Sequence, residues 1–353
     1  MKLFSKKGKS SVGLDIGSSL IKIVEIDHSK EQPVLSKYGI IKLPSEAIVE
    51  GEIMDRSLVI EGINECATKA GIKQSNINTA VSGRAVIVKK VVMDKMNPDD
   101  AKEAIFWEAE QHVPFDIDDV CLDFQILKED VGANQMEILL VAAKKEMVTT
   151  HADLIREAGF NPVIIDVDSF AIQNAYEVTR AGTENIVTGL INIGSETTNI
   201  NIVQNNIPHF TRDLSIGSNV FLESMQRDMG IGLEEAEAIL HEEEEIEDTE
   251  KCRKVIAVAS EELSMGIERS ISFLKTAGDA EQIDEVILSG GGARLPWLRE
   301  ILSEKHGIEF KVNDAVARMD RAENMSEEDA IELEKVGPLL TVSMGLALRR
   351  EEK

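Results

Sequence analysis

The feature that most constrains the fold of this chain is a small polar turn set between apolar strands. Residues 12–19 read VGLDIGSS and place one charged side chain, Asp15, inside an otherwise apolar segment. Small residues follow it, namely Gly17, Ser18 and Ser19. A tight turn of this composition directs backbone N–H groups outward, where they can bind anions. The pattern therefore predicts a β-hairpin that can hold a phosphate.

The same pattern occurs a second time. Residues 189–198 read GLINIGSETT, with Asn192 in the place of Asp15 and Gly194 and Ser195 in the turn. The copies lie roughly half the chain apart, which is too far for an array of short repeats. The sequence therefore predicts two related halves.

Length and charge narrow the classes of function. A chain of 353 residues is long for one core, so two or more domains are expected. The net charge of −26 disfavours nucleic acid and bare anionic membrane as large-surface partners. Aromatic residues make up only 4%, which argues against a base-stacking platform. A phosphate ligand must therefore be held by backbone dipoles, a lysine or a metal ion.

The cysteines and the hydropathy pattern indicate a reduced, cytoplasmic protein. Cys66, Cys121 and Cys252 are widely separated and lack the spacing of a zinc site. No apolar run approaches the length of a membrane span. The basic segment 1–11 has no hydrophobic stretch of the kind found in signal peptides.

Periodicity predicts strands and helices in alternation, with an extra module in the first half. Region 85–161 combines strands at 85–93, 118–127 and 136–143 with helices at 97–115 and after Met147. It looks like a small α+β module set inside a larger domain. The second half restarts with strands at 186–193 and 198–203, and an apolar segment at 337–350 predicts a buried closing helix.

The first hairpin has the chemistry of a magnesium-phosphate site. Asp15 would lie close to bound phosphates, which is favourable only with a divalent cation between them. Lys22 could reach back as a point charge. For one copy alone, an ordinary hairpin with an aspartate at its buried edge is the better interpretation. Two facing copies favour a nucleotide cleft between the halves.

A third turn could complete such a site on the nucleoside side. The segment DEVILSGGGARLPWL, residues 284–298, reads as strand, glycine turn and helix, with Gly290, Gly291 and Gly292 in the turn. It is not a dinucleotide fingerprint, because that pattern needs glycine at Leu295. A Walker pattern also fails at residues 8–10, since Leu3 stands where the first glycine belongs.

These motifs, in this order, resemble the superfamily of actin, sugar kinases and heat-shock chaperones. More narrowly, the chain is similar to the PilM family of type IV pilus proteins from about residue 11 to Arg350. The segments that carry this resemblance are GLDIGSSLIKIVEI, FWEAEQHVPFDIDDV, LLVAAKKEMV, VIIDVDSFAIQNAY, FTRDLSIGSN and LSGGGARLPWL. The stretch at 110–120, EQHVPFDIDDV, is the most specific of them, because general members of the superfamily lack it.

The resemblance implies an α/β, actin-like fold of the duplicated ribonuclease H type with four subdomains, one of them an insertion as in FtsA. The expected ranges are 1–84, 162–184 and 338–353 for the first core subdomain, 85–161 for the insertion, 185–217 and 266–337 for the second core subdomain, and 218–265 for a small acidic subdomain. The resemblance also implies ATP or ADP with Mg²⁺ in the cleft. The expected partner is a PilN-like inner-membrane protein, bound through its cytoplasmic N-terminal peptide, with other pilus platform proteins nearby.

The resemblance places nucleotide contacts on all three turns. The expected cofactor-binding residues are Asp15, Gly17, Ser18, Ser19, Lys22, Asn192, Gly194, Ser195, Thr197, Arg269, Gly290, Gly291, Gly292 and Arg294, and the expected metal ligands are Asp15 and Asp168. Asp168 is also the candidate catalytic residue, although a helix N-cap is an equally good interpretation. For Arg269 alone, a surface ion pair is the better interpretation.

One departure from the superfamily bears on catalysis. Enzymes of this kind commonly have an acid at the start of the second hairpin, and here the residue is the neutral Asn192. Losing such a charge costs orders of magnitude in phosphoryl transfer, so slow hydrolysis or none is expected. The favoured function is an ATP-binding adapter that switches partner binding with nucleotide state. An actin-like filament former and a small-molecule kinase are the alternatives.

Overall fold

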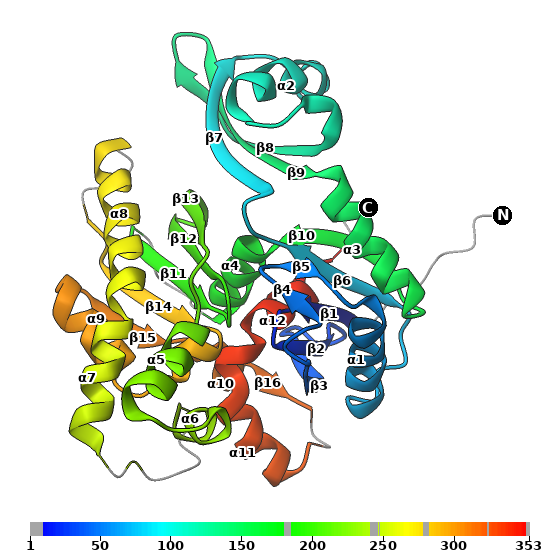
Figure 1. The fold of residues 1–353 in the computed structure, drawn as a ribbon. Coiled ribbons are helices and arrows are strands. Elements are labelled where there is room, and N and C mark those ends of the chain that lie inside the picture. The colour runs from blue at the N-terminus through cyan, green and yellow to red at the C-terminus, as the bar shows by residue number, and fades with distance from the viewer. Residues whose placement is uncertain are drawn as a thin grey trace.

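Two large β-sheets, which share the same order over five strands, form the body of the molecule (Figure 1). The computed structural model describes residues 10–179, 185–240, 246, 248–277, 282–322 and 325–350. Parts of both expected core subdomains, and of the acidic one, lie outside these residues, although the range 185–217 is described completely. The predicted hairpins open both sheets, and the prediction of two related halves is confirmed.

The first sheet has the order β10-β6-β1-β2-β3-β16 in the described residues. Its strands are β1 (Ser10–Ile16), β2 (Leu20–Asp27), β3 (Val34–Lys42), β6 (Asn76–Val81), β10 (Asn161–Val167) and β16 (Asp320–Arg321). Strands β1, β2 and β3 are antiparallel neighbours, whereas β6 pairs in parallel with both β1 and β10. A small hairpin, β4 (Ile48–Val49) with β5 (Glu52–Ile53), precedes helix α1 (Arg56–Lys69).

The second sheet repeats this arrangement in the order β13-β12-β11-β14-β15. Its strands are β11 (Thr188–Ile193), β12 (Thr198–Gln204), β13 (Ile207–Leu214), β14 (Glu285–Ser289) and β15 (Glu309–Val312). Again three antiparallel strands are followed by two parallel ones. Strand for strand, β11 corresponds to β1 and β12 to β2, so the two glycine turns occupy equivalent places.

Two helices lie between the sheets and join the halves. They are α4 (Asp168–Thr179) and α12 (Thr341–Leu348), which share a buried cluster with residues of both sheets. The predicted closing helix is therefore confirmed as α12, preceded by a 3₁₀ turn at Gly337–Leu340. The two helices approach closely at Gly345, where a Cβ atom would overlap the carbonyl oxygen of Ala171. Only glycine allows this contact.

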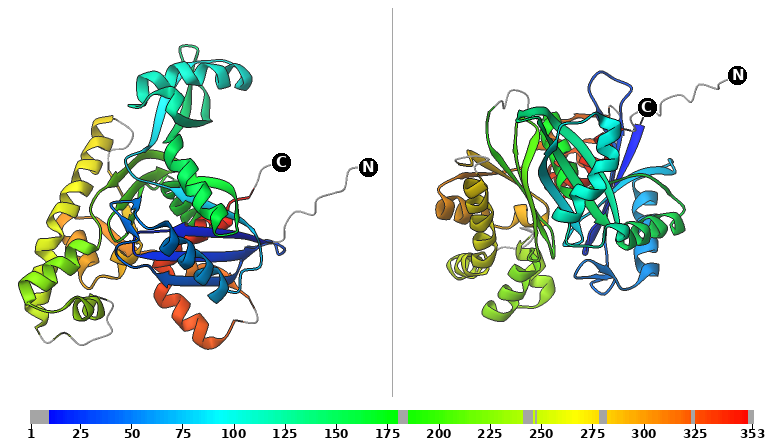
Figure 2. Two further views of the ribbon diagram at one scale, coloured as in Figure 1. Left: turned by 45° about the vertical axis from the view of Figure 1, so that its right-hand side comes forward. Right: turned by 90° about the horizontal axis from the view of Figure 1, so that it is seen from above.

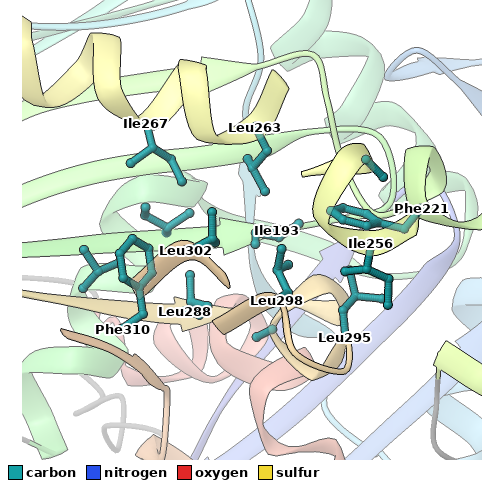
Figure 3. Packing of buried hydrophobic residues seen from close by; sticks show 14 of the residues in the cluster. Ile193, Phe221, Ile256, Leu263, Ile267, Leu288, Leu295, Leu298, Leu302 and Phe310 are labelled. Carbon is teal, nitrogen blue, oxygen red and sulfur yellow. The ribbon is translucent and has the colours of Figure 1, made fainter. Parts of the chain in front are cut away.

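The second half has one continuous core. Its helices are α5 (Asn219–Met229), α6 (Leu233–Leu240), α7 (Thr249–Ala259), α8 (Glu261–Ala277) and α9 (Leu298–His306). Two later helices, α10 (Ala315–Arg318) and α11 (Glu327–Val336), pack on the first half instead. Figure 3 shows Phe221 of α5 and Ile256 of α7 beside Ile193 of the sheet. The range expected as a small acidic subdomain thus shares its core with the second sheet.

A three-stranded module projects from the first half, at the end of the molecule opposite α11 (Figure 2). It contains β7 (Val86–Asp94), α2 (Pro98–His112), the 3₁₀ turn Ile117–Asp119, β8 (Val120–Gly132) and β9 (Gln135–Lys144). We call residues 86–144 the insert. Its helix begins as predicted, because the Asn97 side chain accepts hydrogen bonds from the amides of Asp99 and Asp100. The insert has its own buried core, drawn from the helix and the sheet.

Helix α3 (Lys145–Glu157) belongs by packing to the first half. Its buried residues Leu154 and Ile155 lie in the same cluster as Leu14 of β1 and Ile63 of α1. The expected range 85–161 therefore contains both the insert and one helix that covers the first sheet. No helix in the described residues is both long and apolar enough to span a membrane.

Candidate functional site

The first glycine turn connects β1 to β2 and holds an ion pair at its base. The Gly17 amide donates to the Leu20 carbonyl oxygen over 3.0 Å, which closes the turn. Asp15 and Lys22 face each other across the two strands, and Lys22 Nζ lies 2.7 Å from Asp15 Oδ2. Both side chains are only about one-eighth exposed. The lysine therefore compensates the carboxylate that the sequence places in an apolar strand.

The second turn has the same geometry. The Gly194 amide donates to the Thr197 carbonyl oxygen over 2.9 Å. The carbonyl oxygens of Gly194 and Ser195 accept hydrogen bonds from the amides of Ser218 and Asn219, where α5 begins. These bonds fix the carbonyl oxygens against α5.

The tips of the two turns touch each other. Ser18 Oγ and Ser195 Oγ lie 2.7 Å apart, within hydrogen-bonding distance. In the part of the chain that the structure describes, the amides of Ser18, Ser19, Ser195 and Glu196 donate to no protein acceptor. Free amides at the tip of such a turn are what anion binding requires. The structure therefore brings both predicted phosphate turns to one place.

The third turn packs directly against the second. Gly290 has a φ of +81°, and a Cβ atom there or at Gly292 would overlap Ile193. Ser289, at the end of β14, donates to Asn192 Oδ1 over 3.3 Å. The predicted glycine turn is thus joined to the second hairpin through Asn192.

Asp168 lies at the start of α4, close to the first turn. The Ser82 side chain lies beside its carboxylate, and both residues line the same cavity. Burial and the negative charge of Asp15 raise the pKa of Asp168 to about 7, with a smaller contribution from Asp213. The negative charge of Asp15 therefore acts on Asp168, with Lys22 as a nearby cation, and a divalent cation would relieve the repulsion between the two carboxylates.

Asp213 connects the site to the start of the insert. Its Oδ1 accepts from Asn199 Nδ2 over 2.9 Å, and its Oδ2 accepts from the Gly83 amide over 2.5 Å. Burial raises the pKa of Asp213, and these hydrogen bonds oppose that shift. A cavity of about 120 Å³ lies here, lined by Ser82, Val88, Asp168, Thr211 and Asp213 among others.

Two further expected site residues are arginines of the second half. Arg269 is exposed on α8, and its Nε donates to the Met265 carbonyl oxygen of its own helix over 3.2 Å. The described residues give it no ion pair with a glutamate, so the surface-pair interpretation finds no support. Arg294 is half-buried in the 3₁₀ turn Gly291–Arg294. Their contact with a nucleoside remains a prediction.

A comparison with family models now identifies the chain. The model for the type IV pilus assembly protein PilM matches residues 13–351. The chain belongs to the PilM family. Similarity to a solved structure agrees with this assignment: the PilM–PilN type IV pilus biogenesis complex has a chain that is 27% identical, with a TM-score of 0.85. The match covers 98% of this chain and 99% of that one.

More distant structures show the fold alone. The ethanolamine utilization protein EutJ from Carboxydothermus hydrogenoformans is 17% identical, with a TM-score of 0.56 over 96% of this chain and 89% of that one. MreB5 of Spiroplasma citri, solved with ADP, is 11% identical, with a TM-score of 0.54 over 96% and 95%. This chain of the PilM family therefore has the actin-like α/β fold. The comparisons do not favour the filament or kinase alternatives.

The residues present fit a magnesium-nucleotide ligand. The described residues contain no group of three or more metal-ligating side chains, so a metal cage made by protein alone is absent there. Magnesium usually takes one or two carboxylates and completes its shell with phosphate oxygens and water. Asp15 and Asp168 supply that number. Glu196 adds an observation: its buried Oε2, in the second turn, has no hydrogen-bond partner, which is costly unless a ligand satisfies it.

Sequence reasoning missed three polar residues of this PilM-family site. They are Ser82, Glu196 and Asp213. Glu196 lies inside the quoted GSETT motif, so its position in the turn was available as a signal. Asp213 lies inside the quoted FTRDLSIGSN segment, but its role depends on a partner that only the tertiary fold brings close. The same holds for Ser82, a polar residue that directly follows β6.

Proposed function

We propose that this protein is an ATP-binding adapter of the type IV pilus assembly platform. It binds ATP or ADP with magnesium in the cleft between its halves, and associates with the inner membrane through a PilN-like protein. Membership of the PilM family supports the pilus role, and the likeness to a PilM chain solved with PilN supports the partner. Relatives with this fold have been solved with nucleotides.

The observation that carries the nucleotide proposal is the apposition of the two glycine turns. Their tips approach to 2.7 Å, and both present amides that donate to no acceptor among the described residues. The turns bind phosphate oxygens through these amides, and Lys22 contributes a positive charge. When bound, magnesium would neutralise charge between the phosphates and the carboxylates of Asp15 and Asp168. The third turn contains Gly290, Gly291 and Gly292. It lies beside the phosphates, where it contacts the nucleoside part of the ligand.

Hydrolysis by this site is slow or absent in our proposal. Asn192 is occupied on both sides, because its Oδ1 accepts from Ser289 and its Nδ2 donates to Asn199 Oδ1 over 3.0 Å. It therefore serves as a structural link, and as a neutral amide it can neither accept a proton from an attacking water molecule nor balance the charge of a metal ion. Asp168 is then the candidate for orienting a water molecule or the metal.

The peptide of the partner binds beside the insert. We place it near β7, where the cavity lined by Val88 and Asp168 separates the insert from the body. Extended peptides add to sheet edges or fill apolar grooves, and β7 is an edge strand of the insert sheet. Because the chain carries a charge of −26, a basic contribution from the peptide is expected.

The packing also shapes the proposed division into subdomains. We retain the two core subdomains and the FtsA-type insertion, but we end the insertion at about Lys144 because α3 covers the first sheet. We also assign α10 and α11 to the first core subdomain, because they pack on the first half. Residues 145–161 then join the first core subdomain. Limited proteolysis at the junctions would test these boundaries.

Thermal unfolding tests the proposal most directly. A ligand at about a hundredfold excess over its dissociation constant stabilises the folded state by roughly 2.7 kcal/mol. We therefore expect the melting temperature to rise with millimolar ATP and magnesium, and a synthetic peptide of the cognate PilN N-terminus to bind in calorimetric titration. Failure of ATP with magnesium to shift the melting temperature would contradict the nucleotide site. A turnover above about 1 s⁻¹, in the ordinary range for enzymes, would contradict the adapter role.

A further inference from the structure

A row of hydrogen-bonded side chains crosses the second sheet at one level. Its members are Ser289 of β14, Asn192 of β11, Asn199 of β12 and Asp213 of β13, and each is the register partner of the next. The side chains are bonded in sequence by contacts of 3.3, 3.0 and 2.9 Å. Ser289 and Asn199 are almost fully buried.

One end of this row lies at the nucleotide site. Ser289 directly precedes the Gly290 turn, and Asn192 lies two residues before Gly194 in the second phosphate turn. Any ligand that shifts either turn must move these two side chains or break their hydrogen bond. Buried polar groups cost free energy when they lose a partner, so such rows tend to move together rather than in parts.

The other end lies at the start of the insert. Asp213 Oδ2 accepts from the Gly83 amide, and Gly83 in turn accepts from the Val86 amide over 3.0 Å as β7 begins. Gly83 has a φ of +94°, a conformation that favours glycine, so this residue is a turn between β6 and β7. The carboxylate thus links the second half to the turn from which the insert departs.

We propose that the row from Ser289 to Asp213 transmits the state of the nucleotide site to the insert. The inference rests on the proposed function and specifies its regulation: nucleotide changes the orientation of the insert, and with it the affinity for the partner peptide. Asp213 is the positioning residue, because its two oxygens bond the row and the turn at once. A second hydrogen bond connects the second half to the insert. It joins Lys90 Nζ of β7 to His209 Nδ1 of β13 at 3.2 Å, farther along β7.

The experiment measures coupling between the two ligands of the full-length protein. Fluorescence anisotropy gives the dissociation constant of a labelled PilN N-terminal peptide with and without ATP and magnesium, and calorimetry gives that of ATP with and without the peptide. The two ratios must agree, because coupling between binding sites is reciprocal. For the wild type we expect a ratio of roughly fivefold or more, within the usual range for allosteric coupling.

Asp213→Asn tests the link with minimal change in size. Its single side-chain oxygen can serve Asn199 or Gly83 but not both, so we expect the ratio to fall below about twofold. The ratio remains informative even where the substitution alters either affinity by itself. Asp130→Asn is the matched control, since Asp130 is an exposed carboxylate of the insert that pairs with Lys95, and it should retain the wild-type ratio. His209→Ala should likewise retain most of the coupling.

Hydrogen exchange at residues 82–88 provides a second readout that does not require the peptide. ATP with magnesium should alter exchange there in the wild type and not in Asp213→Asn. Wild-type coupling in Asp213→Asn, or its loss in His209→Ala alone, would overturn the inference and leave the proposed function standing. A wild-type ratio of one with both ligands bound would do the same. Absence of nucleotide or peptide binding would overturn the proposed function, and the inference with it.

Discussion

Ser18 and Ser195 are 177 positions apart in the sequence, yet their hydroxyl oxygens lie within 2.7 Å. Each belongs to the turn that opens one of two sheets, which share the same order over five strands. The contact shows that the halves meet at equivalent points, as expected from a duplicated unit. A phosphate chain between the turns would replace this contact, so occupancy of the site and the separation of the halves are linked.

Asp15→Asn tests the metal. The substitution removes one of the two proposed magnesium ligands and keeps the size of the side chain. We expect the ATP-dependent rise in melting temperature to lose most of its dependence on magnesium, because a neutral amide binds the cation weakly. Thermal scans with ATP, with and without magnesium, measure this. Asp153→Asn is the control, an exposed partner of Arg156 on α3, and an equal magnesium dependence in both variants would contradict the assignment.

Asp168→Asn should stabilise the ligand-free protein in a pH-dependent way. The pKa of Asp168 is about 7 in the folded state, above the usual value of about 4 expected when the chain is unfolded. As pH rises from about 4 to 7 the unfolded state loses this proton first, so wild-type stability falls. Asparagine does not ionise. The stability advantage of the variant should therefore be absent near pH 4, grow through this interval and stay constant above it.

The size and the sign of the stability change in Asp168→Asn can be checked in one experiment. Three pKa units correspond to at most about 4 kcal/mol, and urea titrations at pH 5 and 8 would measure the difference. Asp228→Asn is the control: because the hydrogen bond from Arg227 lowers the pKa of Asp228, that carboxylate is ionised at both pH values, and the effect of its substitution should be the same at pH 5 and 8. A stability gain for Asp168→Asn that is equal at both pH values would argue for a packing effect instead of ionisation.

Asn192→Asp probes why the second turn lacks an acid. In the wild type Asn192 Nδ2 donates to Asn199 Oδ1, and a carboxylate would place acceptor against acceptor. We therefore expect a loss of about 1–3 kcal/mol at neutral pH, the cost of unsatisfied buried polar groups. Protonation of the new acid restores a donor, so the loss should shrink at low pH. Denaturant titration measures both. Unchanged stability, with faster ATP turnover, would instead show that the position is open to a catalytic acid.

The sequence predicted the parts of this site that depend on local composition. Gly17 and Gly194 made the two turns recognisable in the sequence, because few other residues allow the strands to approach so closely. Tertiary relationships were not predictable in the same way. The apolar face of α3, with Leu154 and Ile155, was visible, but periodicity does not say which core a helix covers, and α3 covers the first sheet rather than the insert. The role of Asp213 was likewise not predictable, because it depends on a hydrogen bond from the Gly83 amide, 130 positions away.

Removal of the insert tests the peptide site. The Lys144 amide donates to the Ala85 carbonyl oxygen over 3.1 Å, so the two ends of the insert are adjacent and two glycines can replace residues 86–143. Helix α3 stays in place over the first core. We expect the shortened protein to fold and to keep its ATP-dependent rise in melting temperature, but to lose binding of the PilN peptide in calorimetry.

Point variants keep this prediction testable if the shortened protein fails to fold. Val88→Lys places a positive charge in the cavity between the insert and the body, where it would repel a basic peptide and fill space beside β7. Val131→Lys makes the same change at an exposed position of the insert and should bind as the wild type does. Wild-type binding should also weaken as salt rises, because charge attraction is screened. If the shortened protein, or Val88→Lys, holds the peptide as tightly as the wild type, the peptide binds elsewhere on the molecule.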